Sequence, residues 1–166
     1  MPHARHGGPV AVLRAALAAL ADGPLSVEQA LSVEQASMIV ASAPLGPSRR
    51  RYANAAAIVA TSLAPEALLD RLKGIEHAFG RRMGGMRWGA RVLDLDIVLW
   101  SGGRFASRRL AIPHRELPHR SFVLFPARQI AGDWRDPRSG LTVRHLTARL
   151  TRPRPATRAQ ASRPSG

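Results

Sequence analysis

The chain has 166 residues, enough for one domain with a buried core and too few for two domains of ordinary size. It has no cysteine, which excludes a disulfide framework, a cysteine zinc site and a thiol nucleophile, and fits a cytoplasmic protein. Its 25 basic residues against 11 acidic ones indicate anionic partners, either nucleic acid or a polyphosphate ligand, although a coding bias toward arginine would produce the same excess. No apolar run has the length of a transmembrane helix and no signal-peptide pattern is present, so we expect no membrane contact.

The first part of the chain predicts one helix and two strands. Apolar residues at helical spacing follow Pro9, and a Gly-Pro pair ends this helix. Residues 25–36 are a perfect tandem copy, LSVEQALSVEQA, far shorter in period than known repeat architectures. We therefore expect an inserted duplicate within a longer loop or an extended helix. Residues 37–43 and 52–61 predict the two strands.

The second part predicts a helix, a hairpin and two further helices. Residues 64–80 form an amphipathic stretch with Pro65 in its first turn and Gly80 as its C-terminal stop. We expect a glycine-rich basic loop at 81–89, a strand at 91–100 that pairs with 105–112, helices at 121–132 and 141–150, and a disordered tail at 151–166. Residues 1–150 are then a single α+β domain.

Asp94 and Asp96 are the candidate metal ligands. Strand geometry places two such residues on one face, with their Cβ atoms about 6.6 Å apart, and puts the neighbouring leucines on the other. Two like charges at this spacing repel each other unless a cation lies between them, and Mg²⁺ binds carboxylates together with substrate phosphates. A solvated strand face neutralised by nearby arginines is the alternative that the pair alone leaves open.

The surrounding residues favour phosphate chemistry. Arg81, Arg82, Arg87 and Arg91 lie close to the two aspartates in sequence, and Trp88 offers a stacking face. Carboxylates that hold a metal, with arginines around them, are typical of phosphoryl transfer. No P-loop and no dinucleotide-binding fingerprint is present, so a kinase of the P-loop kind is excluded.

Four other polar residues are informative only when they are considered together with the rest of the sequence. His114 and His119 have no third ligand nearby, so a phosphate contact or a proline-fixed surface loop explains them better than zinc does. Tyr52 and Asn54 are uninformative by themselves, because an Asn beside small residues is compatible with a turn cap or with binding of an amide-like ligand edge.

Four segments together resemble the hydroxymethyldihydropterin pyrophosphokinase family of the folate pathway. They are RYANAA, TSLAPEALLDRLKGIEHAFGR, RWGARVLDLDIVLW and RRLAIPHRELPHRSFVLFP, and they extend from about Pro44 to about Ala131. The resemblance implies transfer of pyrophosphate from ATP to the hydroxymethyl group of 6-hydroxymethyl-7,8-dihydropterin, with release of AMP. It also implies two Mg²⁺ ions and a ferredoxin-like α+β sandwich with a mostly antiparallel sheet. We expect the chain to be a monomer.

The resemblance also assigns roles to individual residues. Asp94 and Asp96 would hold both metal ions, and Arg81 and Arg91 would stabilise the transferring phosphates. The positions implied for the nucleotide are Glu76, Arg87, Trp88, Ile97, Arg109, His114 and Arg120, and those implied for the pterin are Leu45, Tyr52, Asn54 and Phe122.

The sequence departs from the family pattern at three places. The strand and Gly-Ser-Asn turn that open family members are not found here, so we expect a sheet without its first strand. Arg115 and Met83 stand where an aromatic residue and an arginine are usual. A basic nucleic-acid-binding module and an inactive, truncated remnant are therefore the alternatives, and nucleic acid is not an expected partner of the enzyme.

Overall fold

The structure is a computed structural model that describes residues 8–21, 31–42, 52–82 and 93–153. Its elements in chain order are α1 (Pro9–Ala21), β1 (Leu31–Ala36), β2 (Val40–Ser42), β3 (Tyr52–Asn54), β4 (Ala57–Thr61), α2 (Pro65–Arg82), β5 (Phe105–Ala106), β6 (Ala111–Ile112), the 3₁₀ helix η2 (Leu117–His119), α3 (Ser121–Ala131) and α4 (Val143–Thr151). The expected α+β class is confirmed, as are the helices predicted at both ends of the described chain. None of the described helices is long and apolar enough to cross a membrane.

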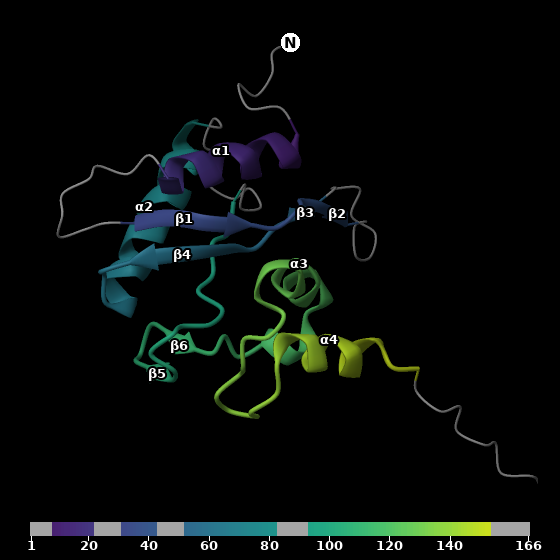
Figure 1. The fold of residues 1–166 in the computed structure, drawn as a ribbon. Helices are drawn as coiled ribbons and strands as arrows, with labels where there is room; N and C mark the ends of the chain where they lie inside the picture. The colour runs from purple at the N-terminus through teal and green to yellow at the C-terminus, as the bar shows by residue number, and fades with distance from the viewer. Residues whose placement is uncertain (1–7, 22–30, 43–51, 83–92, 154–166) are drawn as a thin grey trace, which may run out of the picture.

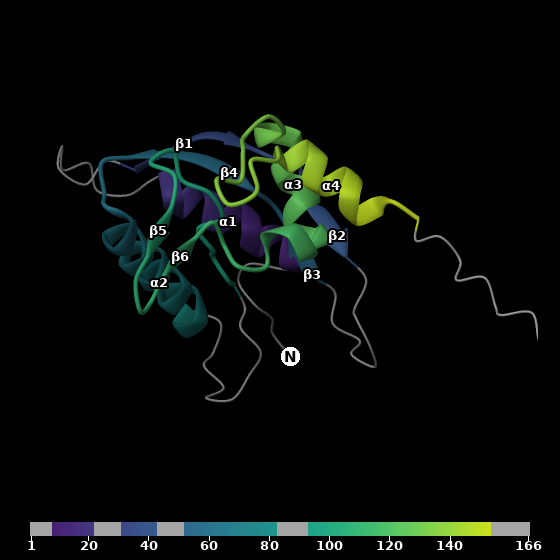
Figure 2. The ribbon, with the colours of Figure 1, turned by 90° about the horizontal axis from the view of Figure 1, so that it is seen from below.

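The strands form three small antiparallel pairs. In the largest, β1 pairs with β4 so that Leu31 lies opposite Thr61 and Ala36 opposite Ala57, with an irregularity between Val33 and Gln35. The pairs β2–β3 and β5–β6 complete the described strands. In Figure 1, α1 lies above the β1–β4 ribbon, and α3 and α4 lie below it. Figure 2 shows the same elements from below.

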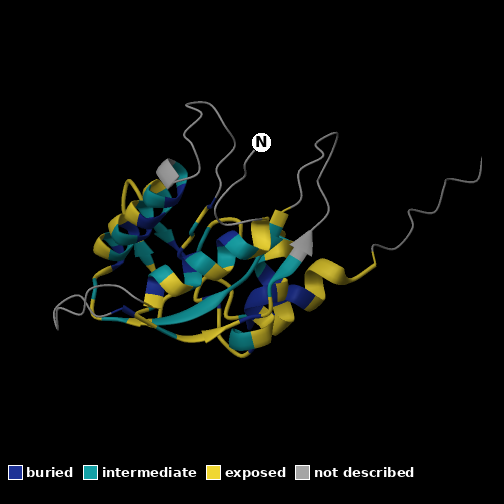
Figure 3. Ribbon diagram, turned by 90° about the horizontal axis from the view of Figure 1, so that it is seen from above, coloured by how far each residue is buried: buried dark blue, intermediate teal, exposed yellow. Residues whose placement is uncertain are grey.

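Two buried clusters hold these layers together (Figure 3). The larger joins α1, α2, β1 and the extended segment 93–97, and its buried members are Val12, Ala16, Leu20, Leu31, Leu69, Leu72, Ile75, Phe79, Leu93, Ile97 and Ile112. The smaller joins η2, α3 and α4 through Leu117, Leu124, Ala127, Val143 and Leu146. Apolar side chains at helical spacing in α1 and α2 explain why both helices contribute to one core.

The structure corrects the prediction made for the tandem copy, residues 25–36. The second copy of LSVEQA is strand β1, so a loop or extended helix over all of 25–36 is wrong, while the first copy lies outside the described residues. The anchor is Ser37, directly after this copy, whose N–H donates to the Ala56 carbonyl over 2.8 Å and whose Oγ accepts from the Ala56 N–H over 2.9 Å. This two-way link fixes the register of the copy that precedes it.

Removing one copy should leave the fold intact. Deletion of 25–30 and deletion of 31–36 give the same sequence, and in either case a LSVEQA copy precedes Ser37. Because loop-closure entropy changes slowly with length, we expect the free energy of unfolding to change by less than about 1 kcal/mol in urea titrations. A Gly/Ser replacement of residues 25–30 is the matched control. A loss above about 2 kcal/mol in the deletion variant alone would show that the longer connection is required.

The expected strand at 91–100 is also corrected. Residues 93–100 carry no strand, and their backbone groups use other partners: Leu95 N–H donates to Glu76 Oε1, and His114 N–H donates to the Val98 carbonyl. Among the described residues β4 has only β1 as a hydrogen-bonded neighbour. A strand needs a ladder partner, and this segment is held instead by an α2 side chain and a loop.

Four smaller predictions need adjustment. The predicted strand 52–61 is divided into β3 and β4, and the predicted partner strand 105–112 folds on itself as the β5–β6 hairpin. Helix α2 continues through Gly80 to Arg82, so this glycine is not the stop. The predicted loop 81–89 overlaps the last turn of α2, and its remainder lies outside the described residues.

Candidate active site

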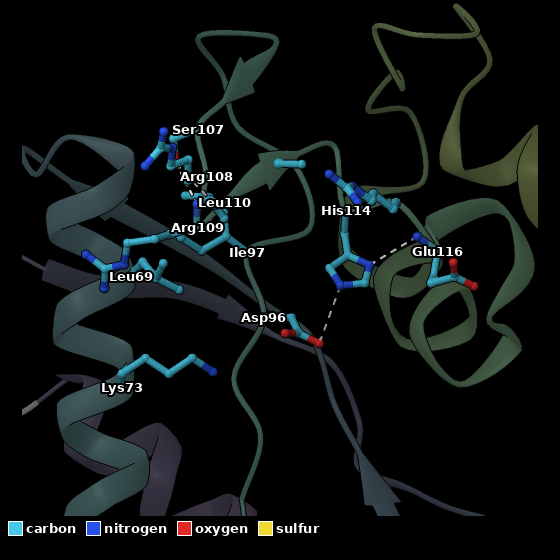
Figure 4. Close-up of a pocket in the computed structure, with 12 residues that line it drawn as sticks. Leu69, Lys73, Asp96, Ile97, Ser107, Arg108, Arg109, Leu110, His114 and Glu116 are labelled. Atoms are coloured by element: carbon cyan, nitrogen blue, oxygen red, sulfur yellow. Dashed lines mark hydrogen bonds and ion pairs between the residues drawn. The ribbon is translucent and has the colours of Figure 1, made fainter.

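An open cleft of about 470 Å³ lies between α2, the extended segment and the β5–β6 hairpin (Figure 4). Four parts of the chain contribute its walls: Leu69 and Lys73 from α2, Asp96 and Ile97 from the extended segment, Ser107, Arg108, Arg109, Leu110 and Ala111 from the hairpin, and His114, Arg115 and Glu116 from the loop that follows. The walls are rich in arginine and carry apolar patches from Leu69 and Ile97. Such a mixture suits a ligand with a flat apolar part and an anionic part.

The two aspartates lie on one exposed side of the extended segment. Leu93 and Ile97 are buried, whereas the side chains of Asp94 and Asp96 are 50% and 40% exposed. The alternation predicted from the sequence therefore holds, even though the segment has no strand partner. Packing of the apolar side chains into the larger core is sufficient to present both carboxylates to solvent.

His114 points toward Asp96 from the opposite side of the cleft (Figure 4). Its Nε2 lies 4.0 Å from Asp96 Oδ2, and the Glu116 N–H donates to its Nδ1 over 3.2 Å. Because Nδ1 accepts this bond, the neutral ring carries its proton on Nε2, the nitrogen that faces Asp96. The imidazole can therefore donate a hydrogen bond to an anionic ligand bound in the cleft.

A buried carboxylate anchors the His114 loop to the C-terminal part of the chain. Asp136 is only 2% exposed and accepts from the Arg138 backbone N–H and side-chain Nε and from Ser139 Oγ. Arg138 in turn donates through Nη2 to the His114 carbonyl over 3.2 Å. These hydrogen bonds fix the backbone of His114 and therefore the position of its imidazole.

Glu76 holds the extended segment against α2. Its Oε1 accepts from the Leu95 N–H over 2.7 Å and from Lys73 Nζ over 2.7 Å, and its side chain is 13% exposed. Leu95 stands between the two aspartates, so this bond sets their position. Glu76 does not line the cleft, and its bonds to Lys73 and Leu95 are those of a residue that orients the carboxylates.

Arg109 is held at the cleft by Asp70 of α2. The guanidinium donates to Asp70 Oδ1, and this hydrogen bond, followed by the Coulomb attraction of the pair, lowers the pKa of Asp70 and raises that of Arg109. A lowered carboxylate pKa means that the pair is fully formed above the ordinary aspartate value and is lost only as pH falls through the lowered one. Arg109 is therefore positioned at every pH at which a phosphate ester is normally assayed.

Asp70→Asn should weaken the binding of an anionic ligand without affecting stability measurably. Both side chains are more than half exposed, and such a pair contributes little to folding. We expect a rise of about two- to fivefold in KM for a nucleotide with kcat unchanged, because the guanidinium loses its fixed position. Asp133→Asn removes a comparable exposed partner from Arg144 and serves as control. Equal KM values in both variants would contradict a positioning role for Asp70.

The aromatic pair predicted for a flat ligand lies on neighbouring elements. Tyr52 on β3 is 47% exposed and Phe122 on α3 is 38% exposed, and β3 and α3 contact one another. The Arg120 guanidinium carbon lies 5.6 Å from the centroid of the Phe122 ring, a cation–π arrangement. Asn54, which ends β3, is half-buried and interacts with other groups. The structure thus brings together the strand and the helix that carry these side chains.

Several predicted site residues fall outside what is described. Leu45, Arg87, Trp88 and Arg91 lie in segments outside the described residues, and only the backbone of Arg81, in the last turn of α2, is described. Their roles stay predictions from the sequence.

The two aspartates fit Mg²⁺ by the chemistry of their donors. They offer exposed carboxylate oxygens, the ligand type that this cation prefers. The described residues contain no group of three or more histidine, cysteine or acidic side chains able to hold a metal. Two carboxylates leave most coordination positions to water and phosphate, which is how Mg²⁺ binds at nucleotide sites.

Sequence reasoning missed the residues that position the others. Lys73, Asp70, Asp136 and Arg138 were not candidates, although Lys73 stands three residues before Glu76, the spacing of a helical ion pair. Arg138, which Asp136 holds, reaches the His114 carbonyl from a distant part of the chain, and nothing in the local pattern predicts that contact.

Comparison with known proteins gives a consistent result. The family model described as 7,8-dihydro-6-hydroxymethylpterin-pyrophosphokinase matches residues 4–132. A 2-amino-4-hydroxy-6-hydroxymethyldihydropteridine pyrophosphokinase from Synechocystis sp. is 40% identical over 123 residues, 74% of this chain and 62% of the relative. The protein of the same name from Haemophilus influenzae is 46% identical over 94 residues, 55% of this chain and 58% of the relative.

A plant relative is similar over a shorter stretch. The mitochondrial folate synthesis bifunctional protein of Arabidopsis thaliana is 46% identical over 82 residues, 49% of this chain and 15% of that protein. The chain thus spans about three fifths of the length of the bacterial relatives it matches, with values of 62% and 58%.

Proposed function

Because the chain belongs to the 7,8-dihydro-6-hydroxymethylpterin-pyrophosphokinase family, we propose that it transfers pyrophosphate from ATP to the hydroxymethyl group of 6-hydroxymethyl-7,8-dihydropterin, a step of folate synthesis. The observation that carries the proposal is the cleft in which Asp96, His114 and the arginines of the β5–β6 hairpin converge. Basic side chains in the same cleft as the Asp96 carboxylate are suited to a metal-bound triphosphate.

The proposed reaction is a direct displacement. The pterin hydroxyl oxygen attacks the β-phosphorus of ATP, a new O–P bond forms, the bond between the β-phosphorus and the oxygen bridging it to the α-phosphate breaks, and AMP leaves with the bridging oxygen. The hydroxyl proton passes to solvent or to a phosphate oxygen. No covalent enzyme intermediate is needed, so alignment and charge neutralisation supply most of the catalysis.

The described residues divide into three proposed roles. Asp94 and Asp96 would hold two Mg²⁺ ions, which when bound neutralise the phosphate charge. His114, through the proton on Nε2, and Arg109, held by Asp70, would contact the phosphates and the nucleotide. Ile97, which lines the cleft, would pack on the adenine, and Arg120 would contribute positive charge beside Phe122. Such contacts fix the substrate for in-line attack.

The pterin is proposed to bind where β3 meets α3. Tyr52 and Phe122 present partly exposed rings on these elements, and stacking on both faces of a flat heterocycle is favourable for aromatic side chains. Asn54 at the end of β3 can recognise the donor and acceptor edge of the ring. From the sequence, Leu45 completes this subsite, and Arg81, Arg87, Trp88 and Arg91 complete the phosphate and nucleotide side.

We further propose that the domain is a monomeric, cytoplasmic ferredoxin-like sandwich. Helices α1 and α2 share one core with β1 and the extended segment 93–97, the arrangement expected when two helices cover one face of a sheet. Within the described residues the sheet is incomplete for such a fold, because β4 pairs only with β1 and 93–100 is not a strand.

The test is an assay with ATP, Mg²⁺ and 6-hydroxymethyl-7,8-dihydropterin that follows AMP release with a coupled enzyme. Pterin-dependent AMP formation is the expected result, and AMP formed at the same rate without pterin would contradict the proposal. A chain that produces no AMP and melts without a cooperative transition would favour the inactive remnant. Binding to a random-sequence oligonucleotide that weakens steeply with salt, without turnover, would favour the nucleic-acid module instead.

A further inference from the structure

Lys73 is the only lysine of the chain and stands on α2 at the edge of the cleft. Its Nζ lies 2.7 Å from Glu76 Oε1 and 3.8 Å from Asp94 Oδ1. In Figure 4 its side chain extends from α2 toward the extended segment. A positive charge is thus placed beside a carboxylate that is proposed to bind a divalent cation.

The ammonium group is held in this place by a carboxylate that is itself fixed. The Glu76 oxygen that contacts Lys73 also accepts the Leu95 N–H over 2.7 Å, and its side chain is mostly buried. Leu95 is the residue next to Asp94, so the same oxygen fixes both the lysine and the segment that carries the aspartate. Lys73 therefore lies near Asp94 because both are tied to the same Glu76 oxygen, Lys73 through its ammonium group and Asp94 through the N–H of the next residue, Leu95.

We propose that Lys73 is a positioning residue that acts as the internal counter-cation of Asp94 and makes metal uptake depend on the nucleotide. The inference rests on the proposed function. Beside an empty phosphate site, the ammonium charge repels a free divalent cation that approaches Asp94. When a triphosphate occupies the cleft, Lys73 gains an anionic neighbour, and its charge then favours the metal–nucleotide complex over the free ion.

A purely structural role for Lys73 gives a different expectation. Lys73 and Glu76 are three residues apart on a helix, and such pairs stabilise helices slightly without reference to any ligand. In that case the lysine affects helix stability alone, and the affinity of the carboxylates for a metal does not change when its charge is removed.

The experiment measures Mn²⁺ binding by electron paramagnetic resonance at low salt, with and without a non-hydrolysable ATP analogue. For Lys73→Met we expect Mn²⁺ alone to bind about three- to tenfold more tightly than to the wild type. The gain in Mn²⁺ affinity caused by the analogue should shrink by a similar factor. Lys73→Arg, which keeps the charge, should stay within about twofold of the wild type.

Two controls make the outcome specific. Arg71→Met removes one positive charge from the same helix. If Arg71→Met changes the Mn²⁺ affinity as much as Lys73→Met does, the inference is overturned. It is also overturned if Lys73→Met leaves the Mn²⁺ affinity unchanged. Asp94→Asn should weaken Mn²⁺ binding in the presence of the analogue. If the wild type binds no Mn²⁺ even with the analogue, the proposed metal site fails, whereas normal ternary binding with no effect of Lys73→Met rejects the lysine's role alone.

Discussion

Asp96→Asn is expected to lower the rate of pyrophosphate transfer by about 100-fold or more while the melting temperature stays nearly the same. The Asp96 side chain is 40% exposed, so the amide can replace the carboxylate without a packing defect. What is lost is a negative charge in a cleft where basic side chains, namely Lys73, Arg108, Arg109 and Arg115, outnumber acidic ones. The measurement is AMP release at saturating ATP and pterin, together with thermal unfolding.

The matched control for Asp96→Asn is Asp133→Asn. Asp133 is 88% exposed and pairs with Arg144 over 3.2 Å, and it is not a cleft residue. The same chemical change there should leave turnover unaltered. Turnover of Asp96→Asn within about threefold of the wild type would refute the metal assignment for this carboxylate.

Leu124→Ala is expected to reduce the free energy of unfolding by about 2–5 kcal/mol, a large share of the stability of a typical domain. Leu124 is fully buried in the cluster that joins α3 to η2 and α4. Truncation leaves a cavity where several side chains meet, and neighbouring helices fill such a cavity only in part. The measurement is a urea titration with unchanged m-value, so that the shift in midpoint reports stability alone.

Phe125→Ala, at the next position of α3, is the control for Leu124→Ala. Phe125 is 41% exposed, so its truncation should cost less than about 1 kcal/mol. Because α3 also carries Phe122, Leu124→Ala should raise the KM for the pterin near its midpoint temperature, whereas Phe125→Ala should not. Equal destabilisation by the two changes would show that the smaller cluster is not a packed core.

Local periodicity determined the helices of this protein. Apolar residues at helical spacing place α1, α2, α3 and α4 close to where the structure has them. The alternation of Leu93, Asp94, Leu95 and Asp96 likewise gives the exposed side of both carboxylates, because each residue's choice between core and solvent depends mainly on its own chemistry.

Tertiary structure decided whatever depends on a partner distant in sequence. The two LSVEQA copies are identical, so no local rule can choose between them, and the bonds between Ser37 and Ala56 determine that the second copy is β1. Residues 93–100 have the composition of a strand, but a ladder requires a neighbouring strand, and Glu76 and the His114 loop satisfy part of their backbone instead.

The same distinction applies to the candidate site. The sequence by itself supplied the chemical groups, namely the aspartate pair, His114, the arginines and the aromatic residues, because these types at this spacing are what a metal-bound polyphosphate and a flat ring require. Only the folded chain placed Lys73 beside Asp94, Asp70 against Arg109 and Arg138 behind His114. Such contacts join residues on different elements, and their energies depend on distances that the linear order does not contain.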